Sequence, residues 1–149
     1  MKDPVTTHTF LGEMLDALPE MRGTVERKVR SAIALELDPA DVTTVRTDVY
    51  ALLRDLFDEV LLPALRAEPG PGRTEELRRC FAFLERVAAS PEPVHPDFLE
   101  GLIGEYLIGA EGPASYAHAG PRVRAAMVRA CGDWGMPVPT EWTDAPPVR

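Results

Sequence analysis

The sequence predicts an all-α protein, either an antiparallel bundle or a short α-solenoid of five to six helices. Apolar residues recur every three or four positions in successive segments, which is the spacing of one face of a helix. No segment alternates polar residues with β-branched apolar ones, and no Asn-Gly or Asp-Gly hairpin turn occurs. No repeat of fixed period is visible, so the pattern leaves the bundle and the solenoid open.

Six segments carry a helical stripe, and helix-breaking residues separate them. The stripes run over residues 10–18, 25–33, 45–60, 77–88, 98–107 and 123–134. Pro19 ends the first pattern, and Thr24 can cap the second helix after Gly23. Pro63 should kink or stop the third helix, because proline lacks a backbone N–H and clashes with the carbonyl one turn back.

The later helices have clear boundary signals. Residues 68–72 are rich in proline and glycine and predict a loop, so the next helix should open at Thr74. Pro96 and Pro121 suit the first turn of a helix, where the missing N–H would have no partner in any case. Gly135 is the expected stop of the last helix, because glycine adopts the left-handed conformation at little cost.

Most aromatic residues are expected in the core because they lie on the stripes: Phe10, Phe57, Phe81, Phe98 and Trp134. Phe83 lies off the main stripe of its helix. It therefore either packs against a neighbouring helix from the side or belongs to an exposed contact patch.

Length and composition predict a single helical domain over residues 1–135, followed by a proline-rich C-terminal tail over residues 136–149. A chain of 149 residues, 45% of them hydrophobic, can bury one core. The tail contains four prolines and little periodicity, so we expect it to be draped on the surface or disordered. Trp142 is its one strong anchor.

Charge and hydropathy predict a cytoplasmic protein that binds neither membranes nor nucleic acid. The first residues lack the apolar stretch of a signal peptide, and the longest aliphatic run, 60–65, is interrupted by Pro63. The net charge of −8 opposes binding to phosphates and anionic lipid and favours a basic partner. Cys80 and Cys131 lie far apart on apolar stripes, so both are expected to be reduced core thiols.

No pattern of a metal site, a cofactor site or a catalytic group is complete in the sequence. Three carboxylates and His95 lie on or next to one predicted helix, but their spacing matches no motif of helical metal ligands: Asp97, Glu100 and Glu105. His8, His95 and His118 are placed in loops or near helix ends, and their spacing does not bring them together. We therefore expect no metal, no cofactor and no enzymatic activity.

One stretch of the chain, residues 87–121, contains no lysine or arginine. It carries five acidic residues: Glu92, Asp97, Glu100, Glu105 and Glu111. A second acidic patch is expected on the third helix, at Asp48, Asp55, Asp58 and Glu59. Such a face can steer a basic partner, or it can be the ordinary solvated surface of an acidic protein. We take the five acids of the stretch, with Phe83, as the candidate partner-binding residues.

Four phrases of the sequence together resemble a known family. They are Phe10-Leu11-x-x-Met14-Leu15 running to Pro19-Glu20, Cys80-Phe81-x-Phe83-Leu84-Glu85, Phe98-Leu99-Glu100 continuing to Tyr106-Leu107, and Gly120-Pro121-Arg122. The family consists of small helical bacterial proteins of unknown function, some of them encoded beside polymorphic toxins and suspected to be immunity proteins. The resemblance covers residues 7 to 135 and brings no catalytic residue with it.

The resemblance implies a non-catalytic protein that neutralises a basic toxin, here through an acidic helical face. Two alternatives stay open: a metal-dependent hydrolase using His95, His118 and nearby carboxylates, and a regulatory or structural adaptor using Phe83 and Trp142 as contacts. Glu85 and Glu100 are the polar positions of the matched phrases. If these carboxylates are buried, they should be paired or bonded to a helix N-terminus, because an unpaired buried carboxylate is costly.

Overall fold

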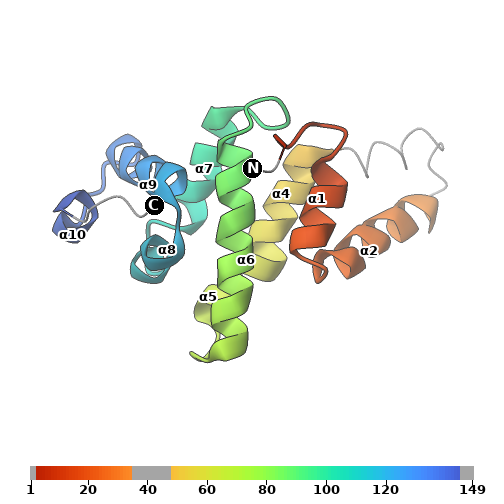
Figure 1. Cartoon of the computed structure of the whole chain (residues 1–149), viewed down its shortest axis with the longest axis horizontal. Helices are drawn as coiled ribbons and strands as arrows, with labels where there is room; N and C mark the ends of the chain where they lie inside the picture. The colour runs from red at the N-terminus through yellow and green to blue at the C-terminus, as the bar shows by residue number, and fades with distance from the viewer. Residues whose placement is uncertain (1–2, 35–47, 145–149) are drawn as a thin grey trace.

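The protein is helical throughout the residues that the computed structural model describes, 3–34 and 48–144 (Figure 1). The all-α class is therefore confirmed. The elements are α1 (Phe10–Ala17), α2 (Met21–Ala34), α4 (Val49–Leu56), the π-helical turn η1 (Phe57–Leu61), α5 (Leu62–Arg66), α6 (Pro71–Ala88), α7 (Pro96–Tyr106), α8 (Gly112–His118), α9 (Pro121–Asp133) and α10 (Thr140–Asp144). Within these ranges no helix combines the length and the apolar character that crossing a bilayer requires.

Several helix boundaries agree with the sequence signals, and two helices start earlier than expected. Helices α7 and α9 begin at Pro96 and Pro121, and Gly135 takes the left-handed conformation just beyond α9, with φ 67°. Helix α6 begins at Pro71 instead of Thr74, because this proline occupies the first helical position. Helix α2 begins at Met21, so Gly23 lies inside it and Thr24 is not its cap.

The predicted third helix continues past Pro63 instead of stopping there. The chain runs from α4 into the wider turn η1 and then into α5, where Pro63 lies in the first turn. A wider turn accommodates a proline that cannot donate to the carbonyl one turn back. The first residues of the predicted stripe, 45–47, lie outside the described residues.

Helix α6 lies in the middle of the molecule and contacts α1, η1, α5, α8 and α9 (Figure 1). Phe83 faces α1, where its ring meets the Phe10 ring edge-on at 5.5 Å and is 1% exposed. The alternative of an exposed contact patch at Phe83 was therefore wrong. The expectation for Trp134 was also wrong, because this residue follows the last turn of α9 and is 57% exposed.

Helix α7 runs in the same direction as both α4 and α9. Tyr50 meets Phe98 near the beginning of α4 and α7, and Phe57 meets Tyr106 near the end. The contacts between α7 and α9 follow the same order along both helices: Glu100 pairs with Arg129, and further on Gly104 lies against the Trp134 ring. Helices distant in the sequence therefore pack side by side, most extensively α7 and α9.

The C-terminal segment packs against the domain through Trp142. This side chain is 5% exposed and stacks on the Tyr116 ring of α8, with ring centroids 4.9 Å apart. The Tyr116 hydroxyl donates a hydrogen bond to the Trp142 carbonyl oxygen, and the Arg124 guanidinium covers the Tyr116 ring at 4.5 Å. Trp142 therefore anchors α10 to α8, and it is not available as an exposed adaptor contact.

Candidate functional site: an acidic end of the molecule

The acidic stretch that the sequence singles out is largely neutralised in the fold. Three of its five acids form ion pairs with arginines from other elements: Glu100 with Arg129 at 2.6 Å, Glu105 with Arg54 at 3.2 Å, and Glu111 with Arg66 at 2.8 Å. The hydrogen bond from Arg66 also holds the pKa of Glu111 below its usual value. The five acids therefore do not form one uncompensated face.

Three of the four acids of the second patch are also engaged inside the molecule. Asp55 and Glu59 form ion pairs with Lys28 and Arg27 of α2. Asp58 accepts a hydrogen bond from the Tyr106 hydroxyl at 2.6 Å. These contacts tie the α4–η1 segment to α2 and α7, so the patch has a structural role.

Glu92 and Asp97 are the two acids of the stretch that no described lysine or arginine pairs with. Glu92 lies in the turn before α7 and accepts a 3.4 Å hydrogen bond from the Thr7 backbone. The Asp97 side chain is 90% exposed in the first turn of α7. Its backbone N–H donates to Nδ1 of His95, which is the N-cap residue of that helix.

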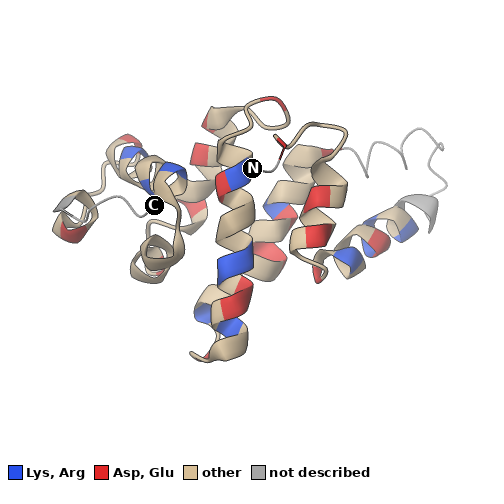
Figure 2. Cartoon of the chain, in the orientation of Figure 1, with Lys and Arg blue, Asp and Glu red and all other residues tan. Residues whose placement is uncertain are grey.

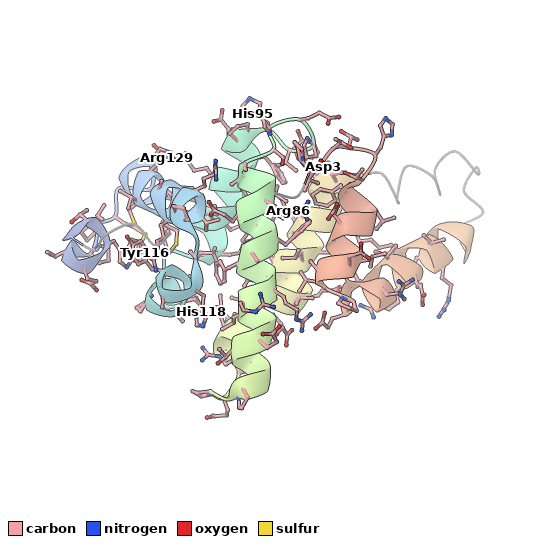
Figure 3. All side chains as sticks on the ribbon, in the orientation of Figure 1. Asp3, Arg86, His95, Tyr116, His118 and Arg129 are labelled. Atoms are coloured by element: carbon pink, nitrogen blue, oxygen red, sulfur yellow. The ribbon has the colours of Figure 1, made fainter. Side chains whose placement is uncertain are left out.

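Four segments meet at this end of the molecule and bring further acids to it. The backbone N–H of Val5 donates to Ser90 Oγ at 3.0 Å, which holds the N-terminal segment against the turn after α6. The backbone N–H of His95 lies 3.3 Å from the Tyr50 hydroxyl, which holds that turn against the start of α4. Figure 3 shows Asp3 and His95 at this end. We call the group Asp3, Asp48, Glu92 and Asp97 the acidic end.

The carboxylates of the acidic end have no lysine or arginine partner among the described residues, and His95 Nδ1 lies 3.7 Å from Asp97 Oδ2. The Arg86 guanidinium binds Glu13 at 2.6 Å and the backbone carbonyl oxygen of Asp3 at 3.0 Å, so it reaches this end through the backbone and not through one of its carboxylates. No described lysine or arginine forms an ion pair with any of the four carboxylates. Figure 2 shows the acidic residues of the turn before α7 and of the start of α7 at this end. The negative potential here is available to a partner.

The histidines proposed as metal ligands lie in different parts of the molecule. His95 caps α7, whereas His118 ends α8, where its ring stacks on Phe81 and Nδ1 is 2.9 Å from the Ala114 carbonyl oxygen. Figure 3 shows the two histidines well apart. Within residues 3–34 and 48–144, no group of three His, Cys, Asp or Glu side chains is arranged to hold a metal ion.

The two acids singled out by the family resemblance are partly buried, and both have partners. Glu100 pairs with Arg129, and Glu85 accepts hydrogen bonds from the backbone at the start of α9. Their side chains are 20% and 19% exposed. Sequence reasoning missed the pairing of Glu105 and Glu111, because the arginines come from positions about fifty residues away in the chain, where no local spacing rule applies.

Comparison with protein-family models, with curated proteins and with solved structures returns no match to the chain.

Proposed function

We propose that the protein is a non-catalytic, immunity-type binding domain that neutralises a toxin by covering a basic surface with its acidic end. The observation that carries the proposal is the charge balance at this end. Four carboxylates gather there without a lysine or arginine partner among the described residues, whereas the other acids of the predicted stretch are paired. The sequence resemblance to helical proteins encoded beside toxins supplies the class of partner.

Complementary charge explains how such an end would act. A negative surface attracts a positive one over about 10 Å at ordinary salt, which raises the rate of encounter and disfavours acidic competitors. The acids here project from the starts of α4 and α7 and from the turn that joins α6 to α7. The Asp48 carboxylate is held in place by the backbone N–H of Ala51 at 3.1 Å, so this group needs little reorganisation on binding.

Co-expression with the product of the neighbouring gene tests the proposal. The expected result is a stable complex on copurification, and rescue of cells in which that product alone is toxic. A neighbour without toxicity, or a toxic neighbour that forms no complex, would overturn the proposed function.

Charge-reversal variants test whether the acidic end is the surface that binds the toxin. The double variant Glu92→Lys/Asp97→Lys should weaken the complex about tenfold or more and should reduce protection of the cells. The matched control is Glu68→Lys/Asp133→Lys, which changes the net charge equally at two exposed acids outside the acidic end. Equal weakening by both double variants would show that only net charge matters and would refute a role for the acidic end.

A further inference from the structure

A second surface of the molecule combines an apolar hollow with arginines. The hollow lies between the end of α6, the turn before α7, the start of α7 and α9, so it borders the acidic end, and its volume is about 190 Å³. Its floor is apolar and buried, with Val87, Val94, Leu99 and Ala126 each at most 5% exposed. Arg122 and Arg129 of α9 stand at its rim. We call this hollow the α6–α7–α9 groove.

The two rim arginines keep most of their hydrogen-bond donors free. Their side chains are 61% and 62% exposed. Arg129 donates to Glu100 through Nε, and a guanidinium offers five donors. The nearest guanidinium nitrogen of Arg122 is 3.6 Å from Glu85, which is beyond hydrogen-bonding distance. Both arginines can therefore bind a further carboxylate.

The carboxylates beneath the rim already have other partners. Both oxygens of Glu85 accept hydrogen bonds from the backbone of Arg122 and Val123, at 2.8 and 3.1 Å. Glu100 accepts the 2.6 Å bond from Arg129. Glu100 holds Arg129, and Glu85 holds the backbone at the start of α9. The remaining guanidinium donors of the rim have no hydrogen-bond partner among the described residues.

A second hollow, between α1 and α6, shows that arginines alone do not make such a groove. Its volume is about 230 Å³, and three arginines line it: Arg78, Arg79 and Arg86. Each of these guanidiniums is bound through two nitrogens within the molecule: Arg78 to Glu75, Arg79 to Glu20, and Arg86 to Glu13 and the Asp3 carbonyl oxygen. The α6–α7–α9 groove differs because its arginines project outward with free donors.

The size of the groove favours one side chain over a whole small molecule. Pockets for drug-sized ligands measure about 300–1,000 Å³, whereas a cavity of about 150 Å³ holds a single benzene ring. A volume of about 190 Å³ therefore suits one aliphatic side chain. Arg122 and Arg129 are seven positions apart on α9, which places them about 10 Å apart along the helix axis. Four residue steps of extended chain span about 13 Å and place the first, third and fifth side chains on one face, so two carboxylates that flank an aliphatic side chain can reach the two guanidiniums.

We propose that the α6–α7–α9 groove binds an extended segment of a partner protein in which an aliphatic side chain lies between two carboxylates. The aliphatic side chain enters the hollow, and the carboxylates bind Arg122 and Arg129. The charge of the occupant is opposite to that expected at the acidic end, so this inference does not depend on the proposed function.

Titration of the isotope-labelled full chain with the peptide Ac-Glu-Ala-Leu-Ala-Glu-NH₂ tests the inference. The expected result is a saturable change in the amide resonances of Val87, Leu99 and Ala126. The peptide Ac-Lys-Ala-Leu-Ala-Lys-NH₂ should bind at least about tenfold more weakly, because it places cations against the arginines. Equal binding of both peptides, or no change at the groove at millimolar concentration, would overturn the proposal.

Two sets of variants test the contribution of the rim arginines and that of the apolar hollow to peptide binding separately. Arg122→Gln/Arg129→Gln should weaken the acidic peptide about tenfold, whereas the control Arg22→Gln, an exposed arginine of α2, should leave binding unchanged. Ala125→Phe adds a ring at an exposed position lining the hollow, and it should block binding while the helical signal and thermal midpoint stay unchanged. If 4-methylpentanoate binds as tightly as the peptide, the groove is a site for small carboxylates and the protein-segment proposal fails.

Discussion

Glu85 of α6 caps the N-terminus of α9. Its Oε1 accepts the backbone N–H of Arg122 at 2.8 Å, and its Oε2 accepts that of Val123 at 3.1 Å. The first N–H groups of a helix have no partner within the helix, and a carboxylate from another helix satisfies them while complementing the helix dipole. The contact requires a glycine at position 120, because a Cβ there would lie 2.6 Å from Glu85 Oε2.

Removing this carboxylate should destabilise the protein. We expect Glu85→Ala to lower the free energy of unfolding by about 2 kcal/mol, because two hydrogen bonds to a charged group are lost. Glu85→Gln keeps one acceptor oxygen, so its free energy of unfolding should lie between those of the Glu85→Ala variant and the parent. Urea unfolding followed by circular dichroism measures both values, and an Ala variant as stable as the parent would contradict the capping role.

The glycine and the carboxylate should be coupled. Gly120→Ala alone should destabilise by roughly 1–3 kcal/mol, because its methyl group forces Glu85 away from the helix start. The φ of Gly120 is −77°, so the cost is steric and not conformational. In the Glu85→Ala background the same change should cost little, and a double-mutant cycle should give a coupling of about 1 kcal/mol or more. Additive effects would contradict this explanation.

The ion pair between Glu20 and Arg79 should make the free energy of unfolding depend on pH in the acidic range. The two hydrogen bonds from Arg79 lower the pKa of the Glu20 carboxyl below 4.5. A lowered folded-state pKa gives a contribution that is present above pH 4.5 and is lost as the pH falls through the folded-state value. Glu20→Gln should therefore lose less stability than the parent between about pH 7 and pH 3.5, as urea midpoints would show. Glu68→Gln, at an exposed acid without an ion pair, should behave like the parent.

Both thiols should be unreactive in the folded protein. Burial raises the pKa of Cys80 to about 12, and burial also raises the pKa of Cys131. The thiolate is the reactive form, so both groups stay protonated at pH 8. We expect Ellman's reagent to titrate neither thiol until denaturant is added, and then both. Rapid reaction of either thiol without denaturant would contradict its place in the core.

The two tryptophans should respond differently to a quencher. Trp134 is 57% exposed, whereas Trp142 is 5% exposed and stacked on Tyr116. The emission of Trp134→Phe, which retains Trp142, should be shielded from iodide. The emission of Trp142→Phe should be quenched strongly. Equal quenching in the two variants would show that α10 does not stay docked on α8 in solution.

The periodicity of the sequence was sufficient to predict the fold class and the starts of α7 and α9. Apolar stripes and prolines are local signals, so Pro96, Pro121 and Gly135 could be assigned without knowledge of the packing. The apolar stripe was a poorer guide to burial for residues at helix ends. Trp134 continues the stripe of α9 but follows its last turn, where the helical spacing no longer sets the direction of the side chain.

The candidate site was predictable only in part. The sequence selected Glu92 and Asp97, which remain free of lysine and arginine among the described residues. It also selected Glu100, Glu105 and Glu111, which arginines neutralise. The absence of basic residues nearby in the chain says nothing about those brought in from other helices. Asp3 and Asp48 joined the acidic end because hydrogen bonds hold their segments beside the turn before α7.

The sequence by itself determined that this chain forms amphipathic helices with an apolar core and an excess of negative charge, because periodicity and composition are properties of the chain alone. Only the tertiary structure decided which charges remain for a partner. Ion pairs such as Glu105–Arg54 and Glu111–Arg66 join residues far apart in sequence, and the parallel course of α4, α7 and α9 brings helices distant in the chain together. The same packing set Glu85 against the start of α9, where it leaves two arginines facing outward beside an apolar groove.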